Sequence, residues 1–405
     1  MANNQKGPNR ILILIGTIIT QMGLGTIYTW SLFNQPLAEK FGWELSSISI
    51  TFSITSFALA FSTLFAGKIQ EKIGIRKLVT FSGIALGGGL LLSSTVKSIG
   101  LLYITAGIIV GAADGIAYMT SLSNCIKWFP ERKGLISGFC VGSYGIGSLI
   151  FKYINAGFIS SKGVSFAFLA WGIIALILIV AGGQLIKAAP EVETSINKAL
   201  VQKQYTQKEM LKTKESYLLF IMIFTACMAG LYLIGVVKDI GVNMVGLDAT
   251  TAANAVAMVA IFNTAGRLIL GPLSDKVGGL KVVTFAFAVT SISILVLAIV
   301  PLNFVTFFTC VSAIAFCFGG NITVFPTIAG EFFGLKNHSK NYGIIYQGFG
   351  IGALSGSFIA NMIGSFKGTF IVMGVMCLIA MIITILIKAP TDRKVRDRNL
   401  RLKTA

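Results

Sequence analysis

The chain is dominated by apolar stretches of about 20 residues, the length at which an α-helix crosses roughly 30 Å of hydrocarbon. No segment between or beyond these stretches is long and apolar enough to bury a core of its own. The sequence therefore predicts an all-α membrane protein of twelve transmembrane helices. The expected spans are 11–33, 46–66, 78–96, 101–123, 134–156, 164–186, 217–237, 250–273, 282–300, 303–329, 341–363 and 367–388.

Composition supports this fold class. Only 12% of the residues are charged, about half the share of a soluble domain, and 55% are hydrophobic. The first apolar stretch continues past Phe33 without a small-residue cleavage site, so it is expected to stay as the first helix and not to be removed as a signal peptide.

The net charge of +18 could indicate a nucleic-acid partner, but its distribution indicates membrane topology. If the N-terminus is cytoplasmic, 26 of the 33 Lys and Arg residues fall in cytoplasmic segments, as the positive-inside rule requires. We therefore expect a multi-pass protein of the inner (plasma) membrane with both termini cytoplasmic and no nucleic-acid partner. The basic tail either fixes topology or contacts anionic lipid. The expected outer-side cations are Lys40, Lys97, Lys152, Lys162, Lys238 and Lys367.

Reactive residues are sparse. The six Cys residues show no paired or metal-ligand spacing, and the single His338 lies in a short polar stretch that is expected to be a loop. No phosphate-cradling nucleotide loop is present. The sequence thus predicts no enzyme, no metal site and no cofactor.

The two halves of the chain are related to each other. They are residues 1–186 and 217–388, joined by a charged linker at 187–216 and followed by a basic tail at 389–405. The loop after the second span has a counterpart about 204 residues later, after the eighth span. Each loop holds an acid among cations, with Gly67, Glu71, Lys72 and Arg76 in the first copy and Asp275 and Lys276 in the second.

These loops resemble the signature loop of the major facilitator superfamily, although Glu71 stands where Asp is usual. The resemblance implies two pseudo-symmetric six-helix bundles that rock around a site near the bilayer midplane. An acid at a helix end can lock neighbouring helices by ion pairs and release them as the bundles move. The alternative is a solvated basic loop that only fixes topology.

Glycines recur at every fourth position in three spans, which gives each a smooth stripe for close helix contact. Such stripes serve either as sliding surfaces or as static packing. They are Gly107, Gly111 and Gly115, then Gly134, Gly138 and Gly142, and finally Gly348, Gly352 and Gly356.

Arg267 is the one cation deep within an expected span. Intramembrane charges are costly and mark functional sites by default. Side chains tilt toward the N-terminus of their helix, which aims this guanidinium at the midplane, where it can hold a carboxylate by two hydrogen bonds. Asn263, one turn earlier on the same face, is expected to donate a further hydrogen bond.

Asp114 is the other deeply placed charge, about mid-membrane in the fourth span. It is interpreted either as a proton carrier or as a fixed counter-charge to Arg267, with a polar packing role as a third alternative. Lys152 lies near the outer end of its span, where extension toward the surface explains it.

Several motifs carry a closer resemblance. They are Gly25-Thr-Ile-Tyr28-Thr-Trp30-Ser-Leu-Phe33, Lys127-Trp-Phe-Pro-Glu-Arg-Lys-Gly134, Asn263-Thr-Ala-Gly-Arg267, Phe325-Pro326 and Asn341-Tyr-Gly343. Together they resemble the oxalate/formate antiporter family, which is related to the monocarboxylate transporters, and most closely its bacterial subgroup linked with pyruvate.

The resemblance implies an anion site formed by Arg267 with Tyr28, Tyr118 and Tyr144. Members that hold oxalate add a Lys at the position of Phe349, so its absence here favours one carboxylate over two. An apolar tail would then meet aromatic residues of the second half. These are Phe318, Tyr346 and Phe349.

We therefore expect a monomeric secondary transporter of small monocarboxylates such as pyruvate, lactate or formate, working by alternating access in the lipid bilayer with protons as a candidate coupling ion. The alternatives within this class are an oxalate/formate-type anion exchanger and a broad-specificity efflux pump. A membrane sensor of carboxylates is the alternative from another class.

Overall fold

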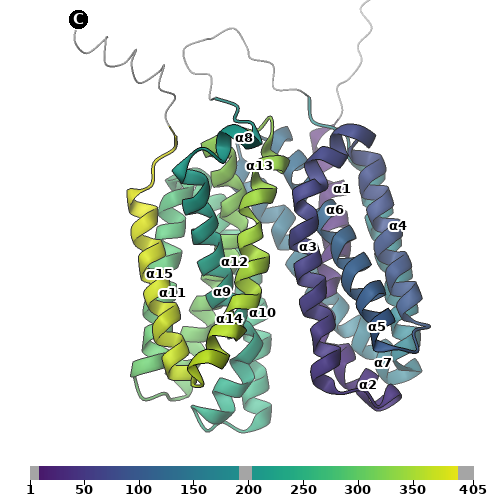
Figure 1. The fold of residues 1–405 in the computed structure, drawn as a ribbon, viewed down its shortest axis with the longest axis vertical. Helices are drawn as coiled ribbons and strands as arrows, with labels where there is room; N and C mark the ends of the chain where they lie inside the picture. The colour runs from purple at the N-terminus through teal and green to yellow at the C-terminus, as the bar shows by residue number, and fades with distance from the viewer. Residues whose placement is uncertain (1–8, 191–202, 391–405) are drawn as a thin grey trace, which may run out of the picture.

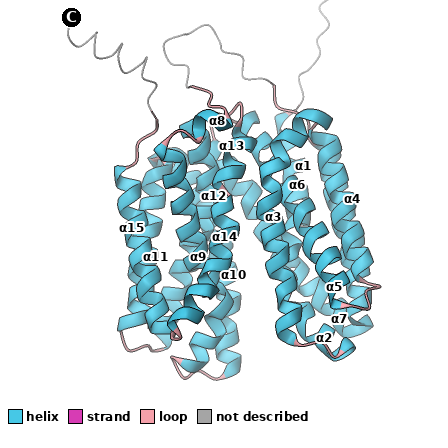
Figure 2. Ribbon diagram, in the orientation of Figure 1, coloured by secondary structure: helices cyan, strands magenta, loops and turns pink. Residues whose placement is uncertain are grey.

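The computed structural model describes residues 9–190 and 203–390. Part of the expected linker (191–202) and nearly all of the expected tail (391–405) lie outside the described residues, as do residues 1–8. Within the described ranges the regular structure is entirely helical (Figure 2). The first half contains α1 (Arg10–Gly25), η1 (Thr26–Thr29), α2 (Ser31–Phe41), α3 (Leu45–Ile73), α4 (Ile75–Ser93), α5 (Ile99–Leu102), η2 (Tyr103–Ile109), α6 (Val110–Trp128) and α7 (Lys133–Leu185).

The second half begins after the linker, whose described end carries a short helix. Its elements are α8 (Gln207–Met210), α9 (Lys214–Asn243), α10 (Ala249–Val277), α11 (Gly279–Ile299), α12 (Phe304–Phe333), α13 (His338–Ile345), α14 (Gln347–Ile363) and α15 (Phe366–Leu386).

Eleven described helical stretches are long and apolar enough to cross a membrane, and one of them holds two crossings. This stretch is the 53-residue α7, in which Gly163 has φ 79° and ψ 169° and breaks the helix between the expected spans 134–156 and 164–186. Only glycine adopts that backbone conformation without strain. The predicted twelve-helix fold is confirmed.

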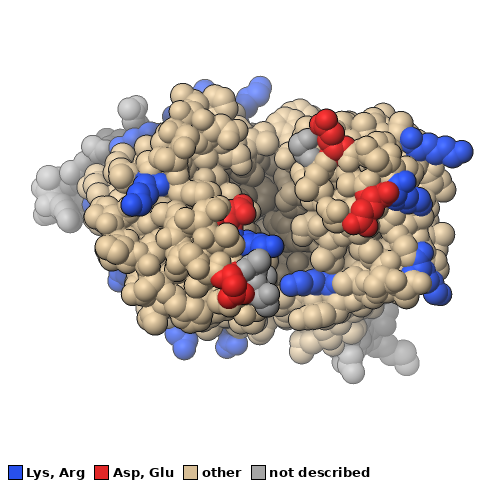
Figure 3. Space-filling model, turned by 90° about the horizontal axis from the view of Figure 1, so that it is seen from below, with Lys and Arg blue, Asp and Glu red and all other residues tan. Residues whose placement is uncertain are grey.

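The two halves stand side by side as two bundles (Figure 1). The described chain ends lie on one face, together with α8 and the start of α13; we call it the terminal face. The other end of the molecule, near α2 and α5, is the opposite face. Viewed from the opposite face, the surface is hollowed between the two halves (Figure 3).

Three expected spans are interrupted by a local change of helix type or a break. The first passes into the 3-10 segment η1, where the Thr26 and Thr29 hydroxyls donate to backbone carbonyls three residues earlier. The fourth contains the π-helix η2, and the eleventh breaks at Tyr346 between α13 and α14. Hydropathy finds the crossings but carries no signal for such local changes of helix type.

The glycine stripes divide into two kinds. Gly134, Gly138 and Gly142 of α7 pack against α10, so this stripe joins the two halves. The other two stripes pack within one half, against α3 and α9 respectively. The prediction that His338 lies in a loop is wrong, because His338 is the first residue of α13 and is 1% exposed. Its ring nitrogens lie 2.9 Å from Ser123 Oγ and 2.8 Å from the Pro326 carbonyl oxygen, which satisfy its polar atoms in the interior.

Candidate functional site

Arg267 lies between the two halves. It is 5% exposed, and no other Lys or Arg in the described ranges is buried. Its Nη1 donates to the Val141 carbonyl oxygen at 2.9 Å, a contact from α10 of the second half to α7 of the first. Its Nε is buried and has no hydrogen-bond partner. A guanidinium has five donors in a planar fork, so this side chain has donor capacity left for an anion.

A small cavity, with room for about one water molecule, adjoins the guanidinium. Its walls come from η1, α3, α6 and α7 of the first half and from α10, α12 and the α13/α14 break of the second. Both halves therefore contribute to one site. The lining residues are Tyr28, Leu59, Tyr118, Val141, Tyr144, Arg267, Ile322 and Tyr346.

Four tyrosines form an aromatic wall in this cavity. The Tyr144 ring meets Tyr28 and Tyr118 edge to face, with centroids 5.5 and 5.7 Å apart. Tyr118 in turn lies 5.5 Å from Tyr346, which stacks on Phe349 at 5.0 Å. The structure thus brings Tyr28, Tyr118, Tyr144 and Tyr346 together with Arg267, and it places Phe349 against Tyr346 without lining the cavity.

Two predicted residues face elsewhere. Asn263 Nδ2 donates to the Ala315 carbonyl oxygen of α12 at 3.4 Å, so this side chain joins two helices. The Phe318 ring packs against Gly230 of α9. Neither residue lines the cavity.

The sequence did not predict the three aliphatic lining residues or the backbone carbonyl that accepts from Arg267. Leu59, Val141 and Ile322 are apolar residues in apolar helices, and nothing in their pattern distinguishes them from core.

Asp114 is fully buried on α6, just beyond the π-helical segment η2. Tyr144 donates its hydroxyl to Asp114 Oδ1 at 3.2 Å, whereas Oδ2 is buried without a partner. Asp114 and Arg267 form no ion pair. The pairs found within 4.0 Å among residues 9–190 and 203–390 are Arg10–Glu131, Lys203–Glu209 and Lys340–Glu71.

The acids of the two repeated loops both reach across to the other half. The Asp275 carboxylate accepts from the Gly134 and Leu135 amides, each at 2.7 Å, at the start of α7. Glu71 pairs with Lys340 of α13 at 2.5 Å. Gly67 packs against the Lys340 side chain. The cations Lys72, Arg76 and Lys276 are exposed.

Further hydrogen bonds close the terminal side of the interface between the halves. Gln347 Nε2 donates to the Ala60 carbonyl at 2.7 Å and to Thr63 Oγ1 at 3.1 Å. Ser137 donates to the Thr323 carbonyl at 2.5 Å. Together with the contacts of Asp275 and Glu71, these bonds join the two halves toward the terminal face, whereas the opposite face is hollowed (Figure 3).

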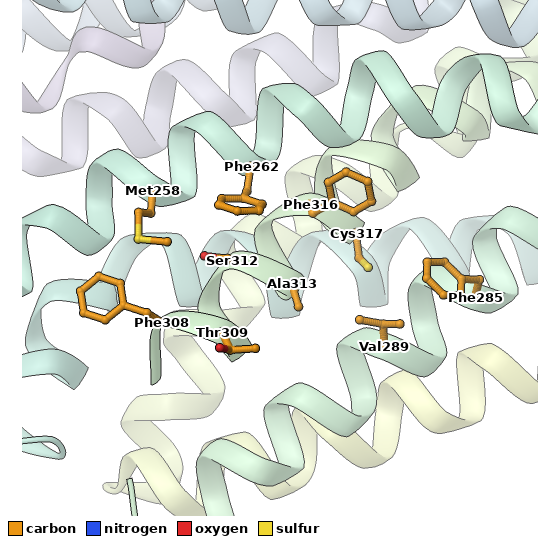
Figure 4. Close-up of a pocket in the computed structure, with 10 residues that line it drawn as sticks. All are labelled: Met258, Phe262, Phe285, Val289, Phe308, Thr309, Ser312, Ala313, Phe316 and Cys317. Carbon is orange, nitrogen blue, oxygen red and sulfur yellow. The ribbon is translucent and has the colours of Figure 1, made fainter. Parts of the chain in front are cut away.

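A larger groove of about 500 Å³ lies between α10, α11 and α12 (Figure 4). Its lining includes Phe262, Phe285 and Phe308 and contains no charged side chain. Phe262 and Phe285 are exposed on the outside of the bundle. Such an apolar surface suits contact with lipid chains and has nothing with which to bind a charged solute.

Comparison with known proteins agrees with this architecture. The family model described as Major Facilitator Superfamily matches residues 13–244 and, again, 218–404. The uncharacterized MFS-type transporter YhjX of Escherichia coli (strain K12) is 48% identical over 345 residues, which cover 85% of this chain and 86% of that protein. The oxalate:formate antiporter of Oxalobacter formigenes is 27% identical over 338 residues, covering 82% and 80%.

A solved structure supports the fold. The crystal structure of FucP, an MFS transporter in the outward conformation, matches with a TM-score of 0.73 at 12% identity, covering 92% of this chain and 97% of that one. These relatives are transporters and not enzymes, which confirms the prediction that the chain is not an enzyme. The repeated halves, the twelve crossings and the family match agree: this multi-pass membrane protein belongs to the major facilitator superfamily, whose members are transporters.

Proposed function

We propose that the chain transports small monocarboxylates of the pyruvate, lactate or formate type by alternating access, with Arg267 holding the carboxylate. One observation carries the proposal: a buried guanidinium has an unused donor beside a cavity shared by both halves. A carboxylate is the small anion that best matches the planar donor fork, and charge-assisted bonds are strong where water is excluded.

The cavity walls favour one carboxylate over two. Arg267 is the single cation in the lining, and the remaining surface is aromatic or aliphatic. A second carboxylate would be left without a counter-charge, which is costly in a buried site. Leu59, Val141 and Ile322 suit a short apolar tail. The likeness to the oxalate:formate antiporter supports an anion as substrate and keeps anion exchange as the second mode of operation.

The terminal face is proposed to be cytoplasmic. Basic residues concentrate on it, in agreement with the positive-inside rule. The closed interface then faces the cytoplasm, and the hollow between the halves opens outward (Figure 3).

Proton coupling is proposed to use Asp114. This carboxyl has no cationic partner and one unpaired buried oxygen. A buried carboxylate without a partner is costly, and a proton removes that charge. Asp114 as a fixed counter-charge to Arg267 would need the contact that the described residues do not make.

Uptake into proteoliposomes tests the proposal. Labelled pyruvate, lactate, formate and oxalate are offered with and without an imposed pH gradient. We expect uptake of the three monocarboxylates, more weakly of oxalate, and loss of uptake in Arg267→Ala. Lys97→Ala, which removes an exposed cation from the opposite face, is the matched control. Undiminished uptake by Arg267→Ala would refute the proposal that Arg267 holds the carboxylate.

A further inference from the structure

Tyr144 belongs to two environments at once. Its ring forms part of the cavity wall beside Arg267, while its hydroxyl donates to Asp114 Oδ1 at 3.2 Å. The residue is 4% exposed, and its ring is held edge to face between Tyr28 and Tyr118. Tyr144 therefore connects the Asp114 carboxyl to the anion site by a single rigid side chain.

The hydroxyl hydrogen of a tyrosine can point only one way at a time. While Asp114 is ionised it is an acceptor, and the Tyr144 hydrogen is committed to it. A protonated Asp114 becomes a donor, and it can give its own hydrogen to the Tyr144 oxygen. The phenol hydrogen is then free to turn toward an acceptor in the cavity. No covalent bond of Tyr144 breaks, and the added proton stays on Asp114.

We propose that Tyr144 is the positioning residue through which protonation of Asp114 strengthens carboxylate binding at Arg267. The inference rests on the proposed function and deepens it by naming the link between proton and substrate. Because coupling between two binding events is reciprocal, a bound carboxylate also favours the protonated Asp114. Proton and anion then bind and leave together, as symport requires.

Asp114 makes no ion pair within the described residues, and its nearest polar neighbours are phenols. The groups that interact with it electrostatically are the phenols of Tyr28, Tyr118 and Tyr144, and Arg267 acts on this cluster from α10. The Cys140 thiol lies one turn before Tyr144 on α7, and Tyr346 reaches the cluster from the α13/α14 break. The charged side chains of α1, α3, α4 and α13, which also pack against α6, lie toward the terminal-face ends of those helices. They are Arg10, Lys68, Glu71, Lys72, Arg76, Lys77 and Lys340. On α7, Lys133 lies at the start of the helix, and Lys152 and Lys162 lie toward the opposite face.

Equilibrium binding of pyruvate to the purified full-length protein, at an acidic and a neutral pH, tests this link. In the wild type we expect pyruvate to bind about tenfold more tightly at acidic pH, the worth of one hydrogen bond to a charged group. Tyr144→Phe removes only the hydroxyl, and it should bind pyruvate with the weaker affinity at both pH values. Asp114→Asn cannot titrate and should also lose the pH dependence.

Tyr118→Phe is the matched control. It removes a hydroxyl from the same cavity that is not bonded to Asp114, so the ratio of affinities between the two pH values should remain. A merely structural effect of Tyr144 would lower affinity at both pH values and keep that ratio.

The outcomes separate the two proposals. If Tyr144→Phe or Asp114→Asn keeps the wild-type ratio, or if Tyr118→Phe abolishes it as well, the link through Tyr144 is refuted. If the wild type binds pyruvate equally at both pH values, the link fails while the anchoring role of Arg267 stands. If the wild type binds none of pyruvate, lactate and formate at either pH, the proposed function itself fails.

Discussion

The Asp275 carboxylate accepts a hydrogen bond from the Gly134 amide at 2.7 Å and so ties α10 of the second half to the first turn of α7 in the first. Its other oxygen accepts from the Leu135 amide at the same distance. Amides at a helix start lack intrahelical partners and carry partial positive charge, which suits a carboxylate. Glu71, in the corresponding loop 204 residues earlier, instead pairs with Lys340 near the start of α13.

Removing the Asp275 charge should loosen the terminal face. A carboxylate at a helix start is worth up to about 2 kcal/mol, so Asp275→Asn should shift the population toward the state open at this face by roughly five- to thirtyfold. Spin labels on cysteines introduced at Lys97 and Val300, exposed positions near the opposite face in different halves, report the change as a shorter distance. The six native cysteines are buried and should not be labelled.

The control for that experiment is Lys276→Gln. It removes an exposed neighbouring charge that makes no ion pair within the described part of the chain. Equal distance distributions in Asp275→Asn and Lys276→Gln would show that Asp275 does not hold the terminal face closed.

Glu71, the acid of the first loop, should contribute less than Asp275 to closure of the terminal face. The Glu71 side chain is 60% exposed, and exposed ion pairs contribute about 0 to 1 kcal/mol. Glu71→Gln should therefore raise the population of the state open at the terminal face by less than about fivefold, as reported by the same spin-label distance. The Glu71→Lys variant should be partly rescued by Lys340→Glu, since the pair is then restored in reverse. A Glu71→Gln effect as large as that of Asp275→Asn would contradict this ranking.

Gly→Ala substitutions in the glycine stripes should have different effects, depending on whether the stripe packs against the other half or within its own half. A Cβ at Gly134 would meet the Gly271 backbone of the other half, so Gly134→Ala should keep the halves from closing at the terminal face. A Cβ at Gly352 would lie 2.6 Å from the Phe224 carbonyl in the same half. Gly352→Ala should therefore lower the melting temperature while leaving the spin-label distance unchanged. The reverse pattern would show that the two stripes have been assigned the wrong roles.

The sequence predicts the helices well because a membrane span needs a long apolar stretch, and it predicts Arg267 because a charge inside such a stretch stands out. It does not show which helices meet. Asn263 shares a helix face with Arg267, yet its amide reaches the Ala315 carbonyl, because α12 packs against that part of α10. Likewise the acceptor for Arg267 is a backbone carbonyl, and every residue has one.

His338 illustrates a second limit. Its polar neighbours predict a loop, but buried polar groups are stable when hydrogen-bonded, and the partners come from distant segments. Ser123 lies 215 positions earlier in the chain. Asn341 nearby donates to the Tyr205 carbonyl, 136 positions away. Such partners can be recognised only once the helices are placed.

A second cation should change the substrate. Phe349 is 3% exposed and stacks on the cavity residue Tyr346, so Phe349→Lys would bring an ammonium group close to the site. We expect the preference for oxalate over pyruvate to rise about tenfold, as one added charge-assisted bond implies. Competition between the two anions measures it, with Phe349→Met as the neutral control. An unchanged preference in a folded Phe349→Lys protein would contradict the proposed position of the substrate's second end.

The central claim is that Arg267 holds the carboxylate, and the dissociation constant of pyruvate measures it most directly. Losing a buried charged partner costs about 3 kcal/mol or more, so Arg267→Ala should weaken binding by at least about a hundredfold. Arg267→Lys should retain part of the affinity, because it keeps the charge without the planar fork. Lys97→Ala should bind as the wild type does. If Arg267→Ala binds pyruvate within about threefold of the wild type, the carboxylate is held elsewhere and the account is wrong.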